Sequence, residues 1–186
     1  SATGFAVDLT SSTAVDEATG ELLRRYGTVD ILVNNAGVDR TVPVSDLEAD
    51  DWDRICAVNL RAPFLLARKL LPVMCERGSG DIVNIVSTAA RRAWPNASAY
   101  HGSKWGLLGF SHALHTEARP HGVRVTAVIA GGMATPFITD RFPECDVSTL
   151  QDPANVAEAV RGVLCLPRGS VVAEITVIPL KETSWP

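Results

Sequence analysis

Residues 29–37 read Val-Asp-Ile-Leu-Val-Asn-Asn-Ala-Gly, and this stretch decides the fold class. Residues 29–33 form an apolar run bounded by polar residues, which is typical of a strand covered on both faces. Asparagine and glycine, which follow at 34–37, tolerate unusual backbone angles and let a flat ligand approach the main chain. The stretch therefore predicts a buried strand that ends in a small-residue loop; an ordinary turn is the alternative.

Short apolar runs alternate with longer amphipathic segments along the rest of the chain. Strands are expected at 5–9, 29–33, 81–86, 123–129 and 171–178, and helices at 10–26, 46–77, 96–119 and from Asp152-Pro153 onward. The apolar side of the helix at 46–77 is expected to consist of Trp52, Ile55, Val58, Phe64 and Leu65, with a kink at Pro63. This alternation predicts one α/β domain over residues 1–186, a Rossmann-like doubly wound parallel sheet with helices on both faces.

Composition limits the class of protein. The 186 residues are 46% hydrophobic and 20% charged with a net charge of −4, so no electrostatic feature points to nucleic acid or a membrane as partner. Four cysteines, Cys56, Cys75, Cys145 and Cys165, are scattered without a metal or redox spacing, and the histidines lack a third ligand nearby. We therefore expect free thiols, no metal site and a cytoplasmic location.

Polar or glycine residues follow the predicted strands rather than precede them. Asp8 follows the first strand, residues 34–37 the second, Ser87 the third and residues 130–132 the fourth. Ligands of open parallel sheets bind beyond the carboxyl ends of the strands. These positions are therefore expected to line one binding site.

Tyr100 and Lys104 lie four residues apart in the stretch SAYHGSKWG, which places them on one face of the predicted helix. A tyrosine with a pKa near 10 is a poor acid or base at neutral pH. A neighbouring ammonium favours the phenolate and lowers that pKa. The spacing alone is a weak pattern, and a helix-surface coincidence is the alternative.

Ser87 and Asn59 are two further candidate residues. Ser87 follows the strand at 81–86, where its hydroxyl is expected to hydrogen-bond a substrate oxygen as charge develops on it. Its context IVSTA lacks the Gly-x-Ser-x-Gly elbow of a serine hydrolase. Asn59 is a mediocre helix former inside a helical segment, so its amide needs partners if it is buried, and it is expected to recruit a water beside Lys104.

Together these segments resemble the short-chain dehydrogenase/reductase family over essentially the whole chain. The matching motifs are DLT at 8–10, VDILVNNAG at 29–37, VNL at 58–60, IVNIVSTAA at 82–90, YHGSK at 100–104 and AGGMATP at 130–136. The resemblance implies an oxidoreductase that interconverts a ketone or aldehyde and an alcohol by hydride transfer, with NAD or NADP as cofactor.

The resemblance also implies a role for each matching residue. Tyr100 would exchange a proton with the substrate oxygen, Lys104 would lower the pKa of Tyr100, Ser87 would orient the carbonyl, and Asn59 would hold a water that relays protons to Lys104. The implied cofactor contacts are Asp8, Leu9, Asn35, Ala36, Gly37, Tyr100, Lys104, Gly131, Met133 and Thr135. Family members commonly pair the helices at 46–77 and 96–119 across a dimer axis, which implies a homodimer or homotetramer.

The chain departs from the family pattern in two places. Ala130 stands where the family has proline before Gly131, which is expected to loosen that loop slightly. The strand, Gly-rich turn, helix, strand and helix that begin the family fold, and that carry the phosphate turn and the NAD/NADP selector, are not in this sequence. The strands at 5–9 and 29–33 then lack a neighbour. We therefore expect the sequence to be the retained part of a longer protein.

The substrate has to be inferred from loops. Arg91, Arg92 and Trp94 lie in one loop, and Phe137 and Phe142 lie in a segment expected to form a flap. The aromatic residues favour a partly apolar ligand, whereas the arginines would meet a carboxylate or phosphate or simply face solvent. A 3-oxoacyl thioester reductase is one candidate, and sugar, steroid and polyol substrates stay open. Two other interpretations are a non-catalytic nucleotide-sensing or scaffold protein, and an epimerase or dehydratase.

Overall fold

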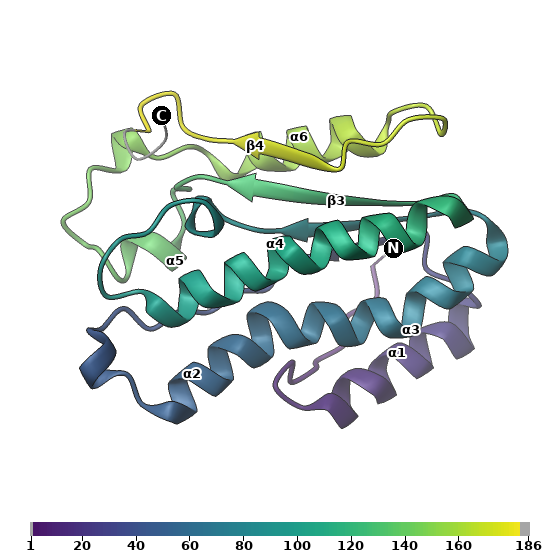
Figure 1. The fold of residues 1–186 in the computed structure, drawn as a ribbon, viewed down its shortest axis with the longest axis horizontal. Coiled ribbons are helices and arrows are strands. Elements are labelled where there is room, and N and C mark those ends of the chain that lie inside the picture. The colour runs from purple at the N-terminus through teal and green to yellow at the C-terminus, as the bar shows by residue number, and fades with distance from the viewer. Residues whose placement is uncertain (1, 183–186) are drawn as a thin grey trace.

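A computed structural model describes residues 2–182 and shows a parallel four-stranded sheet flanked by helices (Figure 1). The strands follow one another in the order β1-β2-β3-β4 across the sheet. Their bounds are β1 Ile31–Asn34, β2 Gly80–Ile85, β3 Val123–Ala130 and β4 Glu174–Val177. All four point the same way, so their carboxyl ends meet at one edge of the sheet.

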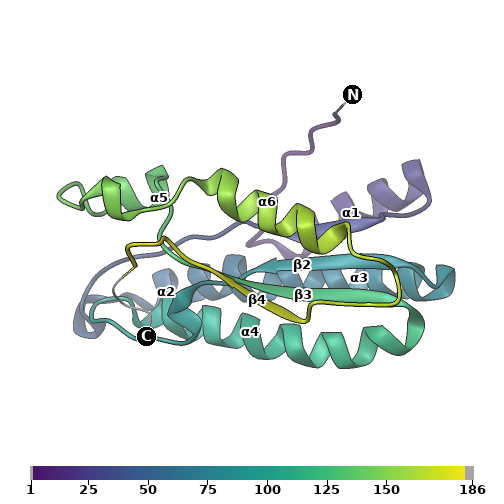
Figure 2. The same ribbon diagram turned by 90° about the horizontal axis from the view of Figure 1, so that it is seen from above.

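The helices cover both faces of this sheet. Their bounds are α1 Ser12–Tyr26, α2 Ala49–Cys56, α3 Ala62–Arg77, α4 Ser98–Ala118, α5 Pro136–Thr139 and α6 Pro153–Leu164. Figure 2 shows α4 and α6 on opposite sides of the strands, while α3 packs beside α4 and α1 packs on α3. The α/β fold class with helices on both faces is confirmed.

The two faces of the sheet form separate parts of the core. Ile82 and Val125 pack against α3 and α4, while their neighbours Val83 and Val128 pack against α6. Alternate residues of a strand point to opposite faces, so a strand covered on both sides is mostly apolar. Valine and isoleucine make up half of β2 and β3, and each such side chain contributes roughly 1.5–3 kcal/mol when fully buried. The buried polar residues of these strands have partners: Asp81 pairs with Arg124, and Asn84 donates to Ser111.

The strand predicted at 5–9 is wrong. These residues are irregular, and Phe5 is 37% exposed. In the described part of the chain β1 pairs only with β2, so no strand stands beside its other edge. A strand with no neighbour leaves its backbone N–H and C=O groups without partners, which is why residues 5–9 do not form one here. The expected cover on both faces of β1 is also wrong, because Ile31 and Val33 are each 45% exposed.

The single long helix predicted at 46–77 consists of α2, a π-helical turn at Ala57–Arg61, and α3. Pro63 is the second residue of α3 and follows the π-helical turn, and the backbone stays helical from one to the other. Because proline has no N–H, a carbonyl group of that turn lacks its helical donor, and the departure from regular α-helix lies beside Pro63. The predicted apolar side is only partly buried: Ile55, Val58 and Leu65 are buried, whereas Trp52 and Phe64 are 42% and 43% exposed.

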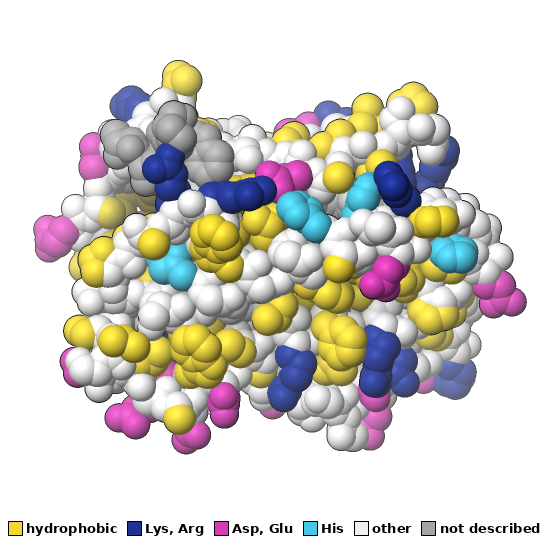
Figure 3. Space-filling model, in the orientation of Figure 1, with side chains coloured by type: hydrophobic (Ala, Val, Ile, Leu, Met, Phe, Trp, Pro, Cys, Tyr) yellow, Lys and Arg dark blue, Asp and Glu magenta, His cyan; other side chains and the backbone are white. Residues whose placement is uncertain are grey.

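One surface of the molecule is rich in exposed apolar side chains. Figure 3 shows hydrophobic side chains gathered over α2, α3 and α4. Trp52 on α2 and Phe64 on α3 belong to the exposed apolar residues of these helices, together with Trp105 on α4, which is 52% exposed. Among residues 2–182, no helix is long and apolar enough to cross a membrane.

Gly122, between α4 and β3, occupies a position that requires glycine. The φ angle of Gly122 is +75°, and a side chain there would overlap the backbone of Gly78. We expect Gly122→Ala to lower the free energy of unfolding by at least about 2 kcal/mol, because both the backbone angle and the space require glycine. Urea unfolding measures this loss.

Gly162 supplies the matched control for that substitution. It lies inside α6, where an added methyl group meets nothing within 4 Å. We expect Gly162→Ala to stabilise the chain by up to about 1 kcal/mol, since alanine is the better helix former. Equal effects of the two substitutions would contradict the assignment of Gly122 as a position restricted to glycine.

Candidate active site

A cavity of about 820 Å³ opens at the carboxyl ends of the strands. Asn35, Ala36 and Gly37 reach it from the end of β1, Ser87 from the end of β2 and Gly131 from the end of β3. Helix α4 contributes Tyr100 and Lys104 to the same lining. The expectation that the residues after the strands line one site holds for those after β1, β2 and β3, whereas Asp8 lies in a separate hollow.

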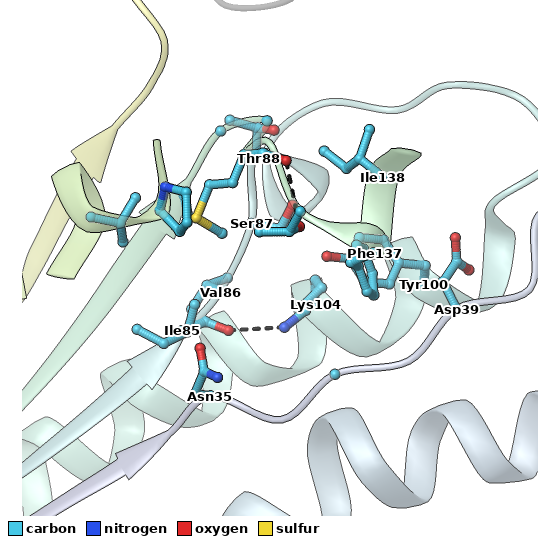
Figure 4. A pocket seen from close by; sticks show the side chains of 18 of the residues that line it. Asn35, Asp39, Ile85, Val86, Ser87, Thr88, Tyr100, Lys104, Phe137 and Ile138 are labelled. Carbon is cyan, nitrogen blue, oxygen red and sulfur yellow. Dashed lines mark hydrogen bonds between the residues drawn. The ribbon is translucent and has the colours of Figure 1, made fainter. Parts of the chain in front are cut away.

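Tyr100 and Lys104 face the cavity from one side of α4 (Figure 4). Lys104 Nζ lies 5.7 Å from the centroid of the Tyr100 ring. The ammonium donates a hydrogen bond to the backbone oxygen of Ile85, the last residue of β2, at 2.8 Å. Tyr100 is 9% exposed and Lys104 is 4% exposed, so both residues are shielded from bulk water.

Ser87 is placed by a turn directly after β2. The residue is extended, and its Oγ accepts a hydrogen bond from the backbone N–H of Ala89 at 3.1 Å, which begins a short 3₁₀ turn at Thr88–Ala90. The Ser87 hydroxyl also hydrogen-bonds the Tyr100 side chain. Two hydroxyl groups therefore meet at one point of the cavity wall, where a carbonyl or carbinol oxygen can contact both.

The pKa values of the pair differ from the sequence-based expectation. Burial raises the pKa of Tyr100 to about 12; the hydrogen bond with Ser87 and the charge of Arg141 lower it, while Asp39 raises it. Burial also lowers the pKa of Lys104 to about 8. The expected lowering of the Tyr100 pKa by Lys104 is not found here, because burial disfavours the charged form of both groups.

Asn59 lies in the π-helical turn behind the cavity, and such turns occur often at functional sites. Its Oδ1 accepts from Val38 N at 2.8 Å, and its Nδ2 donates to Val38 O at 2.8 Å and to Ser103 Oγ at 3.0 Å. The amide therefore joins α4 to the loop after β1. A methyl group at Gly37 would lie 3.7 Å from both Asn59 Oδ1 and Lys104 Nζ, which shows that the two polar groups flank this glycine.

The remaining predicted cofactor residues fall in two places. Gly131, Met133 and Thr135 line the main cavity. Gly131 also packs so closely on Ile178 and Pro179 that a side chain there would overlap them. Asp8 lies apart, in a second hollow beside α2, where its carboxylate accepts hydrogen bonds from the N–H and hydroxyl of Thr10. Leu9 lines neither hollow.

Sequence reasoning missed two charged residues of the cavity, Asp39 and Arg141. Asp39 lies two positions after the small-residue loop at 34–37, and this proximity to a predicted binding loop would have indicated a place in the cavity. Arg141 lies within the segment expected to form a flap, between the aromatic residues Phe137 and Phe142. Trp94, Phe137 and Phe142 do line the cavity, whereas Arg91 pairs with Glu174 at 2.7 Å and is not part of the lining.

Comparison with known proteins agrees with this fold. A profile of the short chain dehydrogenases matches residues 1–146. The D-beta-hydroxybutyrate dehydrogenase of Rhizobium meliloti is 35% identical over 137 residues, 74% of this chain and 53% of the relative. The chain spans about half the length of this relative and of another that it matches, the D-threitol dehydrogenase of Mycolicibacterium smegmatis.

Solved structures give the same result. A metagenomic short-chain oxidoreductase in complex with NADP is 32% identical with a TM-score of 0.81, over 94% of this chain and 72% of that one. A 4-hydroxyisoleucine dehydrogenase complexed with NADH is 25% identical with a TM-score of 0.87, over 94% of this chain and 77% of that one. The chain belongs to the short-chain dehydrogenase family.

The low pKa of Lys104 predicts how stability depends on pH. In the folded chain burial lowers the pKa of Lys104 to about 8, whereas the ordinary pKa of a lysine is 10.5. Between these pH values the unfolded state binds more protons, so the free energy of unfolding rises with pH. We expect wild type to gain about 3 kcal/mol relative to Lys104→Met as the pH rises from about 8 to 10.5.

Urea unfolding of both proteins across this pH range measures the difference. Lys69→Met is the control, because Lys69 is 40% exposed and pairs with Asp16 at 3.5 Å. Its difference from wild type should stay nearly constant over the same range. If the difference in the free energy of unfolding between wild type and Lys104→Met did not change with pH, burial of the Lys104 ammonium would not be unfavourable.

Proposed function

We propose that the protein is an NAD(P)-dependent oxidoreductase that interconverts a ketone or aldehyde and an alcohol. The observation that carries this proposal is the meeting of Ser87, Tyr100 and Lys104 in one cavity at the carboxyl ends of the strands. Membership of the short-chain dehydrogenase family supports it. The NADP and NADH bound to two similar structures support a nicotinamide cofactor, and either form of it fits the argument.

Tyr100 is the proposed acid and base. With its pKa raised to about 12, the phenol is protonated at neutral pH, which is the form that donates to a carbonyl oxygen during reduction. Oxidation of an alcohol requires the phenolate, which the Ser87 hydrogen bond and the Arg141 charge favour. The Ser87 hydroxyl also stabilises the negative charge that develops on the substrate oxygen.

Lys104 and the glycine-containing loops are the proposed cofactor contacts. The ammonium has three N–H donors, and the bond to Ile85 uses one of them, so two can meet ribose hydroxyls. Asn35, Ala36 and Gly37 would hold the adenosine side of the cofactor, and Gly131, Met133 and Thr135 would hold its nicotinamide end; all six line the cavity. The nicotinamide supplies or accepts the hydride. Asn59 Oδ1 keeps a second lone pair that suits a water beside Lys104.

The proposal predicts a large loss of activity in Tyr100→Phe. We expect the rate of hydride transfer to fall by about a thousandfold, at the middle of the range that general acid–base catalysis contributes. Tyr26→Phe is the matched control, because Tyr26 is the other tyrosine, is 52% exposed and lies on α1. The assay follows nicotinamide absorbance with a panel of ketones and alcohols.

The same assay separates the alternatives. Cofactor binding without turnover of any ketone or alcohol would favour a non-catalytic nucleotide-sensing or scaffold protein on the same fold. Turnover without net change in nicotinamide absorbance would favour an epimerase or dehydratase that returns the hydride. Equal rates in wild type and Tyr100→Phe would overturn the assignment of the acid. A 3-oxoacyl thioester remains one candidate substrate, beside sugars, steroids and polyols.

We also propose that the protein acts as a homodimer or homotetramer that pairs α3 and α4 with those of a second copy. Exposed aromatic side chains on this surface support the proposal. Trp105→Glu is expected to shift the protein to monomer in size-exclusion chromatography with light scattering. Val44→Glu, at an apolar residue that is 75% exposed elsewhere, should leave the mass unchanged. Wild type that elutes as a monomer would contradict this proposal.

A cytoplasmic location is proposed as well. The four cysteines are free thiols, and three of them are partly buried. Reduced thiols of this kind are usual where the compartment is reducing. Cell fractionation with an antibody against the chain tests the location, and recovery from an oxidising compartment would overturn it.

A further inference from the structure

The cavity lining contains three charged side chains, and two of them neutralise each other. Lys104 is bonded to the end of β2, as described above. Arg141 Nη1 lies 3.3 Å from Asp39 Oδ2, and the two side chains are 21% and 8% exposed. The loop after β1 and the segment after α5 are therefore joined across the cavity by a largely buried ion pair.

Arg141 is held by more than this ion pair. Its Nη2 donates to the backbone oxygen of Phe137, and its guanidinium lies 3.5 Å from the centroid of the Phe137 ring. The Phe137 ring in turn packs 5.7 Å from the Tyr100 ring. Figure 4 shows Asp39 and Phe137 beside Tyr100. The ion pair therefore lies next to Tyr100, and the Phe137 ring packs against both Arg141 and Tyr100.

Both carboxylate oxygens of Asp39 also accept hydrogen bonds. Its Oδ1 accepts from the backbone N–H of Arg40 at 2.7 Å, and its Oδ2 accepts from the hydroxyl of Thr41 at 3.0 Å. A ligand carboxylate that bound Arg141 would either displace Asp39, leaving that carboxylate buried without its cation, or lie beside the negative charge of Asp39. Breaking a buried pair in this way is strongly unfavourable, and the two like charges would repel each other.

The cavity wall around this pair is apolar. Its large side chains are Trp94, Met133, Phe137, Ile138 and Phe142. We infer that the cavity accepts an uncharged, mainly apolar carbonyl compound or the corresponding alcohol, and that Asp39 excludes anionic substrates by occupying Arg141. This inference rests on the proposed function, because it specifies the substrate class of the same site.

A matched pair of ketones tests the inference: methyl 4-acetylbenzoate, which is neutral, and 4-acetylbenzoate, which is an anion at neutral pH. Both carry the same ketone on the same ring. Calorimetric titration of the full chain with saturating oxidised nicotinamide cofactor measures binding without turnover, since a ketone cannot reduce that cofactor. We expect wild type to bind the ester at least about tenfold more tightly than the acid.

Asp39→Asn should reduce or reverse this preference, because the amide keeps a hydrogen-bonding oxygen but releases Arg141 to the ligand. Arg141→Gln leaves Asp39 without its cation and should weaken binding of the acid further. Asp46→Asn is the control, because Asp46 is exposed and hydrogen-bonds Ser45 outside the cavity. The ratio of the affinities for the ester and the acid should be the same in Asp46→Asn as in wild type.

Three results would overturn the inference: tighter binding of the acid than of the ester by wild type, no binding of either ketone, or the wild-type ratio in Asp39→Asn. Hydride transfer with the reduced cofactor separates this inference from the proposed function. Ester-selective binding without any hydride transfer supports the inference and contradicts the proposed function. Faster reduction of the acid supports the proposed function and overturns the inference.

Discussion

The contact between the Lys104 ammonium and the Ile85 carbonyl oxygen is the interaction on which the site depends. A charged amine is tolerated in the interior only where acceptors meet it, so this bond fixes how α4 is rotated against the end of β2. That rotation turns Tyr100 toward the cavity and Ser103 toward Asn59. The sheet edge, the helix and the loop after β1 are thereby held in one arrangement.

The same arrangement buries two ionisable side chains and so disfavours the charged form of each. Burial disfavours the phenolate of Tyr100 and the ammonium of Lys104 alike, and their pKa values move apart to about 12 and about 8. Perturbed titrating groups of this kind are typical of functional sites. Ser87 and Arg141 favour the phenolate and Asp39 opposes it, so the reactivity of Tyr100 depends on residues of three different segments.

Local signals in the sequence were enough for most elements and for the central residues. Asp152 caps α6 as its position before a proline predicted, and the Tyr100–Lys104 spacing and Ser87 after a strand predicted residues that do share the cavity. The failures concern properties that are not local. Whether residues 5–9 form a strand depends on a neighbouring strand, and the direction of the Tyr100 pKa depends on burial.

The ion pair between Asp39 and Arg141 was missed for the same reason, because its two members lie far apart in sequence and meet only in the fold. It differs from the Ser87, Tyr100 and Lys104 group in what supports it. That group lies on α4 and directly after β2, both packed in the core, whereas the pair joins two connecting segments. Connecting segments vary more readily than a sheet and its packed helices. A change at Asp39 or Arg141 therefore alters both the charge of the cavity and the attachment of the segment that covers Tyr100, while the reacting groups keep their positions.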